Sequence, residues 1–410
     1  MSLVTHLSCV QCGRRVAEGE AWTCPTCGPD EGILDIHFDL DRARQTLTRT
    51  ALTTRTRSHW RYRELLPLAD AHCPTDGHIG WTPLVEAPRL ATALGIARIR
   101  LKDDGRNASA SFKDRASSVG VQHALQTGLR EIACASTGNA ASSLAHCAAA
   151  AGLACNIFVP QSVPEGKLAQ LLAYGARVFK VKGPYDKAYD LCGDACARFG
   201  WYNRNCAINP YLVEGKKTGG LEVAEQCADD PPDWVAVSVG DGCTIAGIAK
   251  GLASMKAVGI VSWSARVLGV QAAGVAPILD AMTTNRLDRA GTGTTYADSI
   301  NCPVPRNWRK AVNAVRESNG AMIAVSDEQI MEAVRVTGRL SGIFAEPAAA
   351  TAVAGIAEAR RKGIISAKAS VVAMITGNGL KDISGALKAV GQPHEIAPEV
   401  GDVARVVESA

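Results

Sequence analysis

The chain has 410 residues, of which 47% are hydrophobic and 20% charged, and its formal net charge is +4. This length supports a large core and more than one lobe, and the composition is that of a globular protein. The weak positive charge is not gathered into one run, which argues against nucleic acid as a partner and leaves room for a small anionic ligand.

The first residues lack a basic segment followed by an apolar one, so we expect no signal peptide. The most apolar window, 144–160, contains His146 and Asn156 and predicts a buried helix followed by a strand rather than a membrane span. Ten of the 14 cysteines are scattered singly along the chain, as in proteins of a reducing compartment. We therefore expect a cytoplasmic protein that does not contact membranes.

Two C-x-x-C pairs open the chain, Cys9 with Cys12 and Cys24 with Cys27. This double spacing is typical of four thiolates that bind one zinc ion, and the alternative is four free surface thiols. Segment 1–35 has little else to form a core, so zinc would supply its folding energy. Four cysteine ligands leave no open coordination position, and we expect a structural, zinc-ribbon-like segment.

From about residue 95, predicted strands and helices alternate, which indicates a parallel sheet with helices on both faces. The expected strands cover 97–102, 132–136, 156–159, 177–181, 234–239 and 370–375. The expected helices cover 111–128, 139–151, 166–174 and 185–199, a helix from 245, a helix from the capping box at 326–329 to about 340, and one starting near Pro347. The last residues, 393–410, read as a loosely held tail.

Three segments share one design, in which a strand ends in a turn of small residues and a helix follows. They are Ser136-Thr137-Gly138-Asn139, Gly240-Asp241-Gly242-Cys243-Thr244, and the segment 376–382 that begins with Thr376. Such turns direct backbone N–H groups at an anion, and the carboxyl ends of strands in an open α/β sheet can converge on one cleft. Each turn alone is weak evidence, because tight turns need glycine for structural reasons as well.

Lys113 lies in the first turn of the predicted helix 111–128, where the helix dipole disfavours a cation. The same field would lower the pKa of Lys113 and aid formation of a neutral amine nucleophile. The alternative is a lysine on a solvated helix face, which is the usual environment of lysine.

Segment 107–115, N-A-S-A-S-F-K-D-R, resembles the N-P-T-G-S-F-K-D-R segment of threonine synthases and their fold-type-II pyridoxal-phosphate relatives. Further elements are similar to the family's in the same order: G-W-T-P-L at 80–84, S-T-G-N at 136–139, N-P-Y-L-V-E-G-K-K-T at 209–218 and T-G-N-G-L-K-D at 376–382. The resemblance implies an α/β fold like that of the tryptophan synthase β subunit, with two three-layer lobes around a cleft. The larger lobe would comprise 36–120 and 215–392, and the smaller, mobile lobe 121–214. Members of this family are often homodimers.

The resemblance also implies roles for residues. Lys113 would bind pyridoxal 5′-phosphate as a Schiff base, Phe112 would pack near its ring, Asn139 would meet its phenolic oxygen and Thr376 its pyridine nitrogen. Gly240, Asp241, Gly242, Cys243 and Thr244 would hold its phosphate. The substrate would contact the amides of Ser136, Thr137 and Gly138 through its carboxylate, and Arg106, Ser109 and Asn209 elsewhere.

The implied reaction converts O-phospho-L-homoserine and water to L-threonine and phosphate, with Lys113 moving the protons. An alternative is another fold-type-II lyase that performs β-elimination or β-replacement on serine, O-phosphoserine or a pathway-specific amino acid. A third possibility is a non-catalytic protein in which the zinc segment contacts a partner and the α/β body is a scaffold.

Two departures from the family pattern bear on the substrate. The Pro-Thr-Gly of the lysine segment is Ala108-Ser109-Ala110 here, and Leu212 replaces an arginine that in many threonine synthases helps to bind the substrate phosphate. A dianionic phosphate without a guanidinium is poorly compensated, so we expect Arg106 to supply the charge. The alternative for Arg106 is an ion pair with Asp103 or Asp104.

Overall fold

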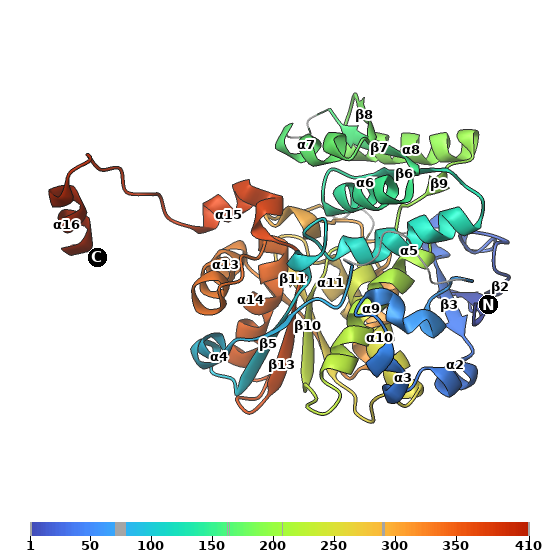
Figure 1. Ribbon diagram of the computed structural model, residues 1–410, viewed down its shortest axis with the longest axis horizontal. Coiled ribbons are helices and arrows are strands. Elements are labelled where there is room, and N and C mark those ends of the chain that lie inside the picture. The colour runs from blue at the N-terminus through green and yellow to red at the C-terminus, as the bar shows by residue number, and fades with distance from the viewer. Residues whose placement is uncertain are drawn as a thin grey trace.

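The computed structural model describes residues 2–69, 79–161, 163, 165–206, 208–288 and 292–408. Its strands form three sheets, and helices cover the two larger ones (Figure 1). The α/β class expected from the alternation of elements is thereby confirmed.

The largest sheet has six strands in the order β12-β11-β10-β13-β5-β4. All its neighbours are parallel except β4, which runs antiparallel to β5. The strands are β4 (Leu84–Glu86), β5 (Arg98–Asp103), β10 (Trp234–Ser238), β11 (Arg266–Ala272), β12 (Ala321–Val325) and β13 (Ser370–Ile375). One face packs on α4 (Pro88–Leu94), α13 (Asp327–Ser341) and α14 (Pro347–Arg361), and the other on α9 (Tyr211–Gln226), α10 (Cys243–Ala257), α11 (Pro277–Thr284) and α12 (Trp308–Glu317).

The second sheet has four parallel strands in the order β8-β7-β6-β9 and lies within the range expected for the smaller lobe. Its strands are β6 (Glu131–Ala135), β7 (Ala154–Pro160), β8 (Arg177–Val181) and β9 (Tyr202–Asn203). One face packs on α5 (Lys113–Gln126), α6 (Asn139–Ala151) and α7 (Glu165–Ala173), and the other on α8 (Tyr185–Phe199).

The N-terminal segment forms an antiparallel sheet in the order β2-β1-β3, made of β1 (Val4–Cys9), β2 (Arg15–Val16) and β3 (Leu34–Phe38). Its apolar side chains pack against Val119 of α5 and Tyr211 of α9. The short elements of this end are α1 (Gly28–Glu31), α2 (Leu40–Thr46), α3 (Arg49–Thr54) and the 3-10 turn η1 (His59–Leu65).

Local sequence signals account for several element boundaries. The capping box at Ser326 is present, because Ser326 and Gln329 exchange side-chain and backbone hydrogen bonds at the start of α13. Pro347 occupies the first turn of α14, as expected. The helix predicted for 111–128 begins only at Lys113, because Ala110 adopts a left-handed φ of 63° and Ser111 pairs with Gly377.

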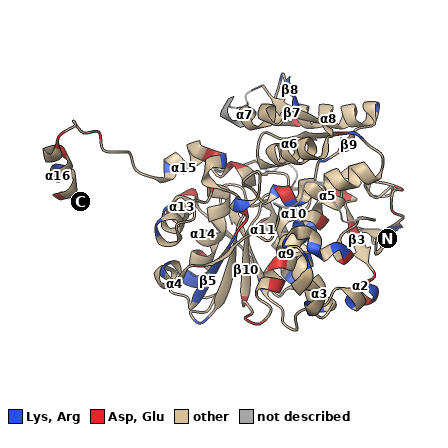
Figure 2. Cartoon of the chain, in the orientation of Figure 1, with Lys and Arg blue, Asp and Glu red and all other residues tan. Residues whose placement is uncertain are grey.

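Helix α9 is the central helix of the molecule, and every residue from Tyr211 to Ala224 is buried. Its charged side chains are paired inside the protein. Glu222 binds Arg115 and Lys102, and Lys217 binds Glu214. Lys and Arg lie interspersed with Asp and Glu around α9, whereas α6 carries neither (Figure 2).

The end of the chain differs from the rest. After α15 (Ile383–Ala389), an extended segment leads to α16 (Val400–Glu408), which has no buried residue and lies away from the body (Figure 1). The tail predicted from the sequence therefore carries a helix that we did not expect. Among the described residues, no helix combines the length and the apolar character needed to cross a bilayer.

Candidate active site

Lys113 is positioned by backbone hydrogen bonds between two distant segments. The N–H of Phe112 donates to the carbonyl of Thr376 over 2.8 Å, and the N–H of Asn378 donates to the carbonyl of Ala110 over 3.1 Å. The lysine segment is thus held against the turn that follows β13, and Lys113 begins α5 beside Thr376.

A cavity of about 130 Å³ opens at this junction, at the carboxyl ends of the strands of the large sheet. It is lined by seven of the predicted cofactor residues, namely Lys113, Gly240, Asp241, Gly242, Cys243, Thr244 and Thr376. Three segments far apart in the sequence therefore meet in one place. Cys206, Lys216 and Glu346 also line this cavity, together with the 3-10 turn η3 (Asp298–Ile300).

The segment 240–244, called the glycine loop below, is held in shape by the segment that leads into α12. Asp241 accepts hydrogen bonds of 2.8 Å from the N–H of Arg306 and from the side-chain amide of Asn307. Gly242 has a φ of 96°, and a Cβ there would lie 2.7 Å from the carbonyl oxygen of Asn307. Glycine is therefore required at this position. The loop leads directly into α10, whose free N–H groups form an anion-binding helix end.

The environment of Lys113 favours a neutral amine. Burial first, and then the positive charge of Lys216, lower the pKa of Lys113, while Cys206 and Glu346 act in the opposite direction. The direction agrees with the expectation from the helix dipole, but the main causes are burial and a second lysine. A lysine next to another cation in a desolvated site is a typical activated amine.

Asn139 lies at the border between this cavity and a second one. Its side-chain amide donates to both carboxylate oxygens of Glu346, each over 3.0 Å. Burial raises the pKa of Glu346. The second cavity, of about 250 Å³, is lined by Thr137, Gly138, Asn139 and residues that follow Gly379, including Lys381. It is the space available beside the loop predicted to bind the substrate carboxylate.

The other predicted residues lie outside both cavities. Phe112 is fully buried, with its ring packed against Gly219 of α9. The Ser109 N–H and hydroxyl both donate to Asp114, at 2.7 and 2.5 Å. Asn209 holds the start of α9 by accepting from the N–H of Tyr211 and donating to the carbonyl of Asn203. Ser136 accepts from the N–H of Gly138 over 3.2 Å.

Arg106, which is predicted to bind the substrate phosphate, and Arg115 of α5 differ in their surroundings. Arg106 is exposed, and its contact with a substrate stays a prediction. Asp104, a partner considered for it, binds Arg115 at 2.8 Å. Arg115 is fully buried between Asp104 and Glu222, which leaves it a structural role.

The four N-terminal cysteines form one cluster. Their sulfur atoms all lie within 4.8 Å of one another, and Cys12 and Cys24 are 3.8 Å apart. Two equivalent turns produce this arrangement, because the N–H of Gly13 donates to the carbonyl of Cys9 and that of Gly28 to Cys24, both over 2.9 Å. Both glycines have positive φ. The described cysteines form no disulfide.

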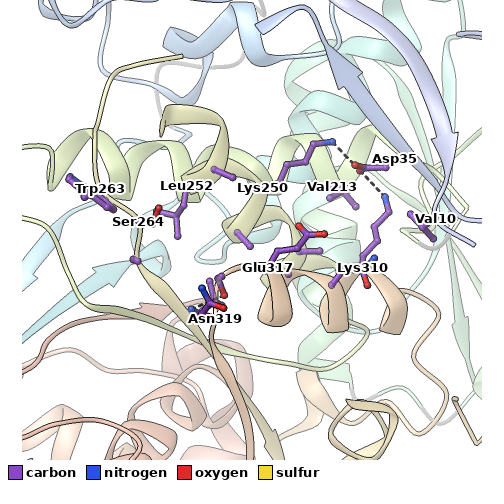
Figure 3. Close-up of a pocket in the computed structure, with 18 residues that line it drawn as sticks. Val10, Asp35, Val213, Lys250, Leu252, Trp263, Ser264, Lys310, Glu317 and Asn319 are labelled. Atoms are coloured by element: carbon purple, nitrogen blue, oxygen red, sulfur yellow. Dashed lines mark hydrogen bonds and ion pairs between the residues drawn. The ribbon is translucent and has the colours of Figure 1, made fainter. Parts of the chain in front are cut away.

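A larger cavity, of about 360 Å³, lies between the N-terminal sheet and α9, α10 and α12 (Figure 3). None of the predicted site residues is among the described residues that line it. On its floor, Lys250 and Lys310 both reach one carboxylate oxygen of Asp35, at 3.0 and 3.3 Å (Figure 3). The N-terminal segment thus helps to compensate both lysines, and Lys250 also pairs with Glu214 of α9.

Sequence reasoning missed three titratable residues that line the lysine cavity, Cys206, Lys216 and Glu346. Lys216 stands inside a motif that was recognised, but nothing in its spacing showed the direction of its side chain. Glu346 immediately precedes the helix-starting Pro347, which was noticed for its structural effect only. Cys206 had no local signal at all.

Comparisons with known proteins agree with this arrangement. The family described as "Pyridoxal-phosphate dependent enzyme" matches residues 75–377. A threonine synthase of Methanocaldococcus jannaschii is 36% identical over 404 residues, which cover 98% of both chains. A threonine synthase of Mycobacterium leprae is 36% identical over 348 residues, which cover 85% of this chain and 94% of that protein.

Solved structures with the same fold include threonine deaminase isoform 2 of Solanum lycopersicum, with a TM-score of 0.65 and 21% identity over 75% of this chain and 82% of that one. Maize serine racemase has a TM-score of 0.65 and 20% identity, over 75% of this chain and 91% of that one. These likenesses show the two-lobed fold. Together with the matches over most of the sequence, they show that the chain belongs to the pyridoxal-phosphate-dependent enzyme family, in the group that contains the threonine synthases.

Proposed function

We propose that this protein is a threonine synthase, which converts O-phospho-L-homoserine and water to L-threonine and phosphate. The observation that carries the proposal is the meeting of Lys113, the glycine loop and Thr376 in one cavity. The relatives named threonine synthase over 98% of the chain support the choice of substrate.

The residues of the cavity suit pyridoxal phosphate. Lys113 offers an amine with a lowered pKa for the aldehyde, and the loop at the start of α10 offers N–H groups for the phosphate. A side chain at Gly242 would meet Asn307, so the loop keeps its backbone open. When bound, pyridoxal phosphate supplies an electron sink for the α-carbon of the substrate.

The chain's own residues perform the remaining tasks. The neutral Lys113 amine takes a proton from the α-carbon and then one from the β-carbon, and the phosphate leaves from the γ-carbon. A proton is then delivered to the γ-carbon, water adds at the β-carbon, and Lys113 returns a proton to the α-carbon. The amides of Ser136, Thr137 and Gly138 bind the substrate carboxylate, which replaces the Ser136 hydroxyl as acceptor of the Gly138 N–H. Thr376 would offer a hydroxyl to the cofactor nitrogen, and Asn139, whose amide now donates to Glu346, would donate to the cofactor's phenolic oxygen.

We further propose that the four cysteines bind a structural zinc ion. With Zn–S bonds of about 2.3 Å, a tetrahedral site separates its sulfurs by roughly 3.8 Å. The Cys12–Cys24 distance of 3.8 Å matches this spacing. A cytoplasmic homodimer, in which the smaller lobe closes over the substrate, completes the proposal.

One observation favours a second candidate, a lyase that acts on another hydroxy or phosphorylated amino acid. Leu212 is fully buried and lies against Gly120 of α5, so this position provides no charge for a substrate phosphate. Fold and cofactor do not decide the substrate by themselves.

A substrate panel on the purified holoenzyme separates the candidates. We expect phosphate and threonine from O-phospho-L-homoserine, and little keto acid from serine or threonine. Keto acid as the main product would establish the second candidate instead. In Lys113→Ala, we expect the visible absorbance of the lysine-bound cofactor and the turnover to disappear together.

A further inference from the structure

Lys216 is a buried cation that the mechanism above does not use. It is 2% exposed, lies on α9 and lines the same cavity as Lys113 and the glycine loop. Its amine donates to the sulfur of Cys206 over 3.0 Å, and Lys216 takes part in none of the ion pairs among the described residues. A buried cation without a carboxylate is costly unless a ligand or another anion compensates it.

A second buried cation, Arg204, also contacts Cys206. The Arg204 guanidinium is 2% exposed, donates to the Ser117 hydroxyl over 3.0 Å and approaches the Cys206 sulfur at 3.5 Å. A hydrogen bond from Cys243, and then the charges of Lys216 and Arg204, hold the pKa of Cys206 well below its usual value despite burial. Two buried cations, Lys216 and Arg204, therefore lie close to Cys206, which is itself next to Cys243, the first residue of α10.

The neighbouring lysine on α9 behaves differently. Consecutive helix residues point about 100° apart, and Lys217 faces the N-terminal segment instead. It pairs with Glu214, and its amine lies 3.8 Å from the centre of the Phe38 ring. Only Lys216 of this pair reaches the cavity.

The position of Lys216 is also relevant to the family arginine that Leu212 replaces in this chain. Leu212 and Lys216 are four residues apart in α9, which places them on one face of the helix. The positive charge that the family pattern puts at 212 is thus absent there, and a positive charge is present one turn further along.

We propose that Lys216, supported by Arg204, binds a phosphate monoester group held at the glycine loop of this enzyme. This rests on the proposed function, because the two phosphate esters available to such a site are the cofactor and the phosphorylated substrate. The Cys206 sulfur occupies the partner position of Lys216 until the phosphate arrives. A charge-assisted contact of this kind changes affinity by roughly ten- to a hundredfold.

The test compares pyridoxal phosphate with pyridoxal, which lacks the phosphate, as ligands of the cofactor-free protein. Both aldehydes need a neutral Lys113 to form the Schiff base. The dissociation constant of pyridoxal divided by that of pyridoxal phosphate therefore reports the phosphate contact alone. In Lys216→Met we expect this ratio to fall by about tenfold or more, and in Lys216→Arg to be largely restored. Lys217→Met is the matched control and should leave the ratio unchanged.

A second arm identifies the source of the phosphate. If the ratio stays constant in Lys216→Met while the KM for O-phospho-L-homoserine rises about tenfold or more, the phosphate bound is that of the substrate. If neither the ratio nor this KM changes, the proposal is wrong. The first arm needs no turnover, so a fall in the ratio establishes the contact with the cofactor phosphate even if the chain acts on another amino acid. Lys216→Gln provides the same comparison should the methionine variant fail to fold.

Discussion

The side-chain amide of Asn139 donates to both carboxylate oxygens of Glu346. This pair joins the first residue of α6, which packs on the four-stranded sheet, to the residue that precedes α14, which packs on the six-stranded sheet. The two residues are 207 positions apart in the chain. Their contact is the direct polar link between the loop predicted to bind the substrate carboxylate and the cavity that contains Lys113.

We expect Asn139→Ala to bind pyridoxal phosphate but to lose about ten- to a hundredfold in kcat, because a donor to the cofactor's phenolic oxygen is removed. Steady-state kinetics at saturating cofactor measure this loss. Ser142 lies on the same helix as Asn139 and accepts a hydrogen bond from Lys381. Ser142→Ala, which removes this contact, serves as a neighbouring comparison. An unchanged kcat in Asn139→Ala would contradict the role given to this side chain.

The pH dependence of cofactor attachment should move in opposite directions in two variants. Lys216 lowers the pKa of Lys113 and Glu346 raises it, with Cys206 and Arg204 as the other charges facing the amine. Attachment needs the neutral amine, so it increases as pH rises through the Lys113 pKa. Its midpoint should shift upward in Lys216→Met and downward in Glu346→Gln. Visible absorbance against pH follows both midpoints, and shifts of the same sign would refute the assignment.

Ala110 stands where the family pattern has glycine, and its φ is 63°. A left-handed conformation costs an alanine about 1–2 kcal/mol, and glycine avoids this cost but gives the unfolded chain about 0.4–1 kcal/mol of extra entropy. Ala110→Gly should therefore raise the free energy of unfolding by roughly 0.5–1 kcal/mol. Denaturant titration measures the change. Ala108→Gly, in the same segment, is the control and should not stabilise the protein.

Removal of zinc should loosen one end of the molecule. The cysteine segment packs on Val119 and Tyr211, and Trp22 lies edge-on to the ring of Tyr211. Chelation should therefore lower the melting temperature and change the tryptophan fluorescence, because metal binding supplies folding energy to so short a segment. Cys12→Ser should reproduce both effects with less bound metal. If the purified protein contains no metal and chelation leaves its melting temperature unchanged, the zinc site is excluded.

Much of the α/β frame could be predicted from local signals. The ranges 139–151, 177–181, 185–199 and 370–375 agree with α6, β8, α8 and β13 residue for residue. Their apolar runs are bounded by glycines or prolines, which act within a few residues. The meeting of Lys113, the glycine loop and Thr376 followed from a general property of parallel sheets, whose strand ends share one edge.

Helix α9 could not be predicted in the same way. It is buried on all sides, so it lacks the one-sided apolar stripe that identifies a surface helix. Glu222 is tolerated there only because Arg115 and Lys102 reach it from α5 and β5. The direction of Lys216 depends on the same packing. Such pairings join residues a hundred or more positions apart, and no local pattern contains them.

The compensation of Lys250 and Lys310 by Asp35 has a practical meaning for anyone who shortens this protein. The N-terminal cysteine segment has a small sheet of its own, which invites its removal as a detachable module. A cut beyond Asp35 would instead leave Lys310 without a carboxylate partner among the described residues, and Lys250 would keep only Glu214 of its two carboxylate partners there. Trimmed versions should therefore replace Lys310 by an uncharged residue at the same time.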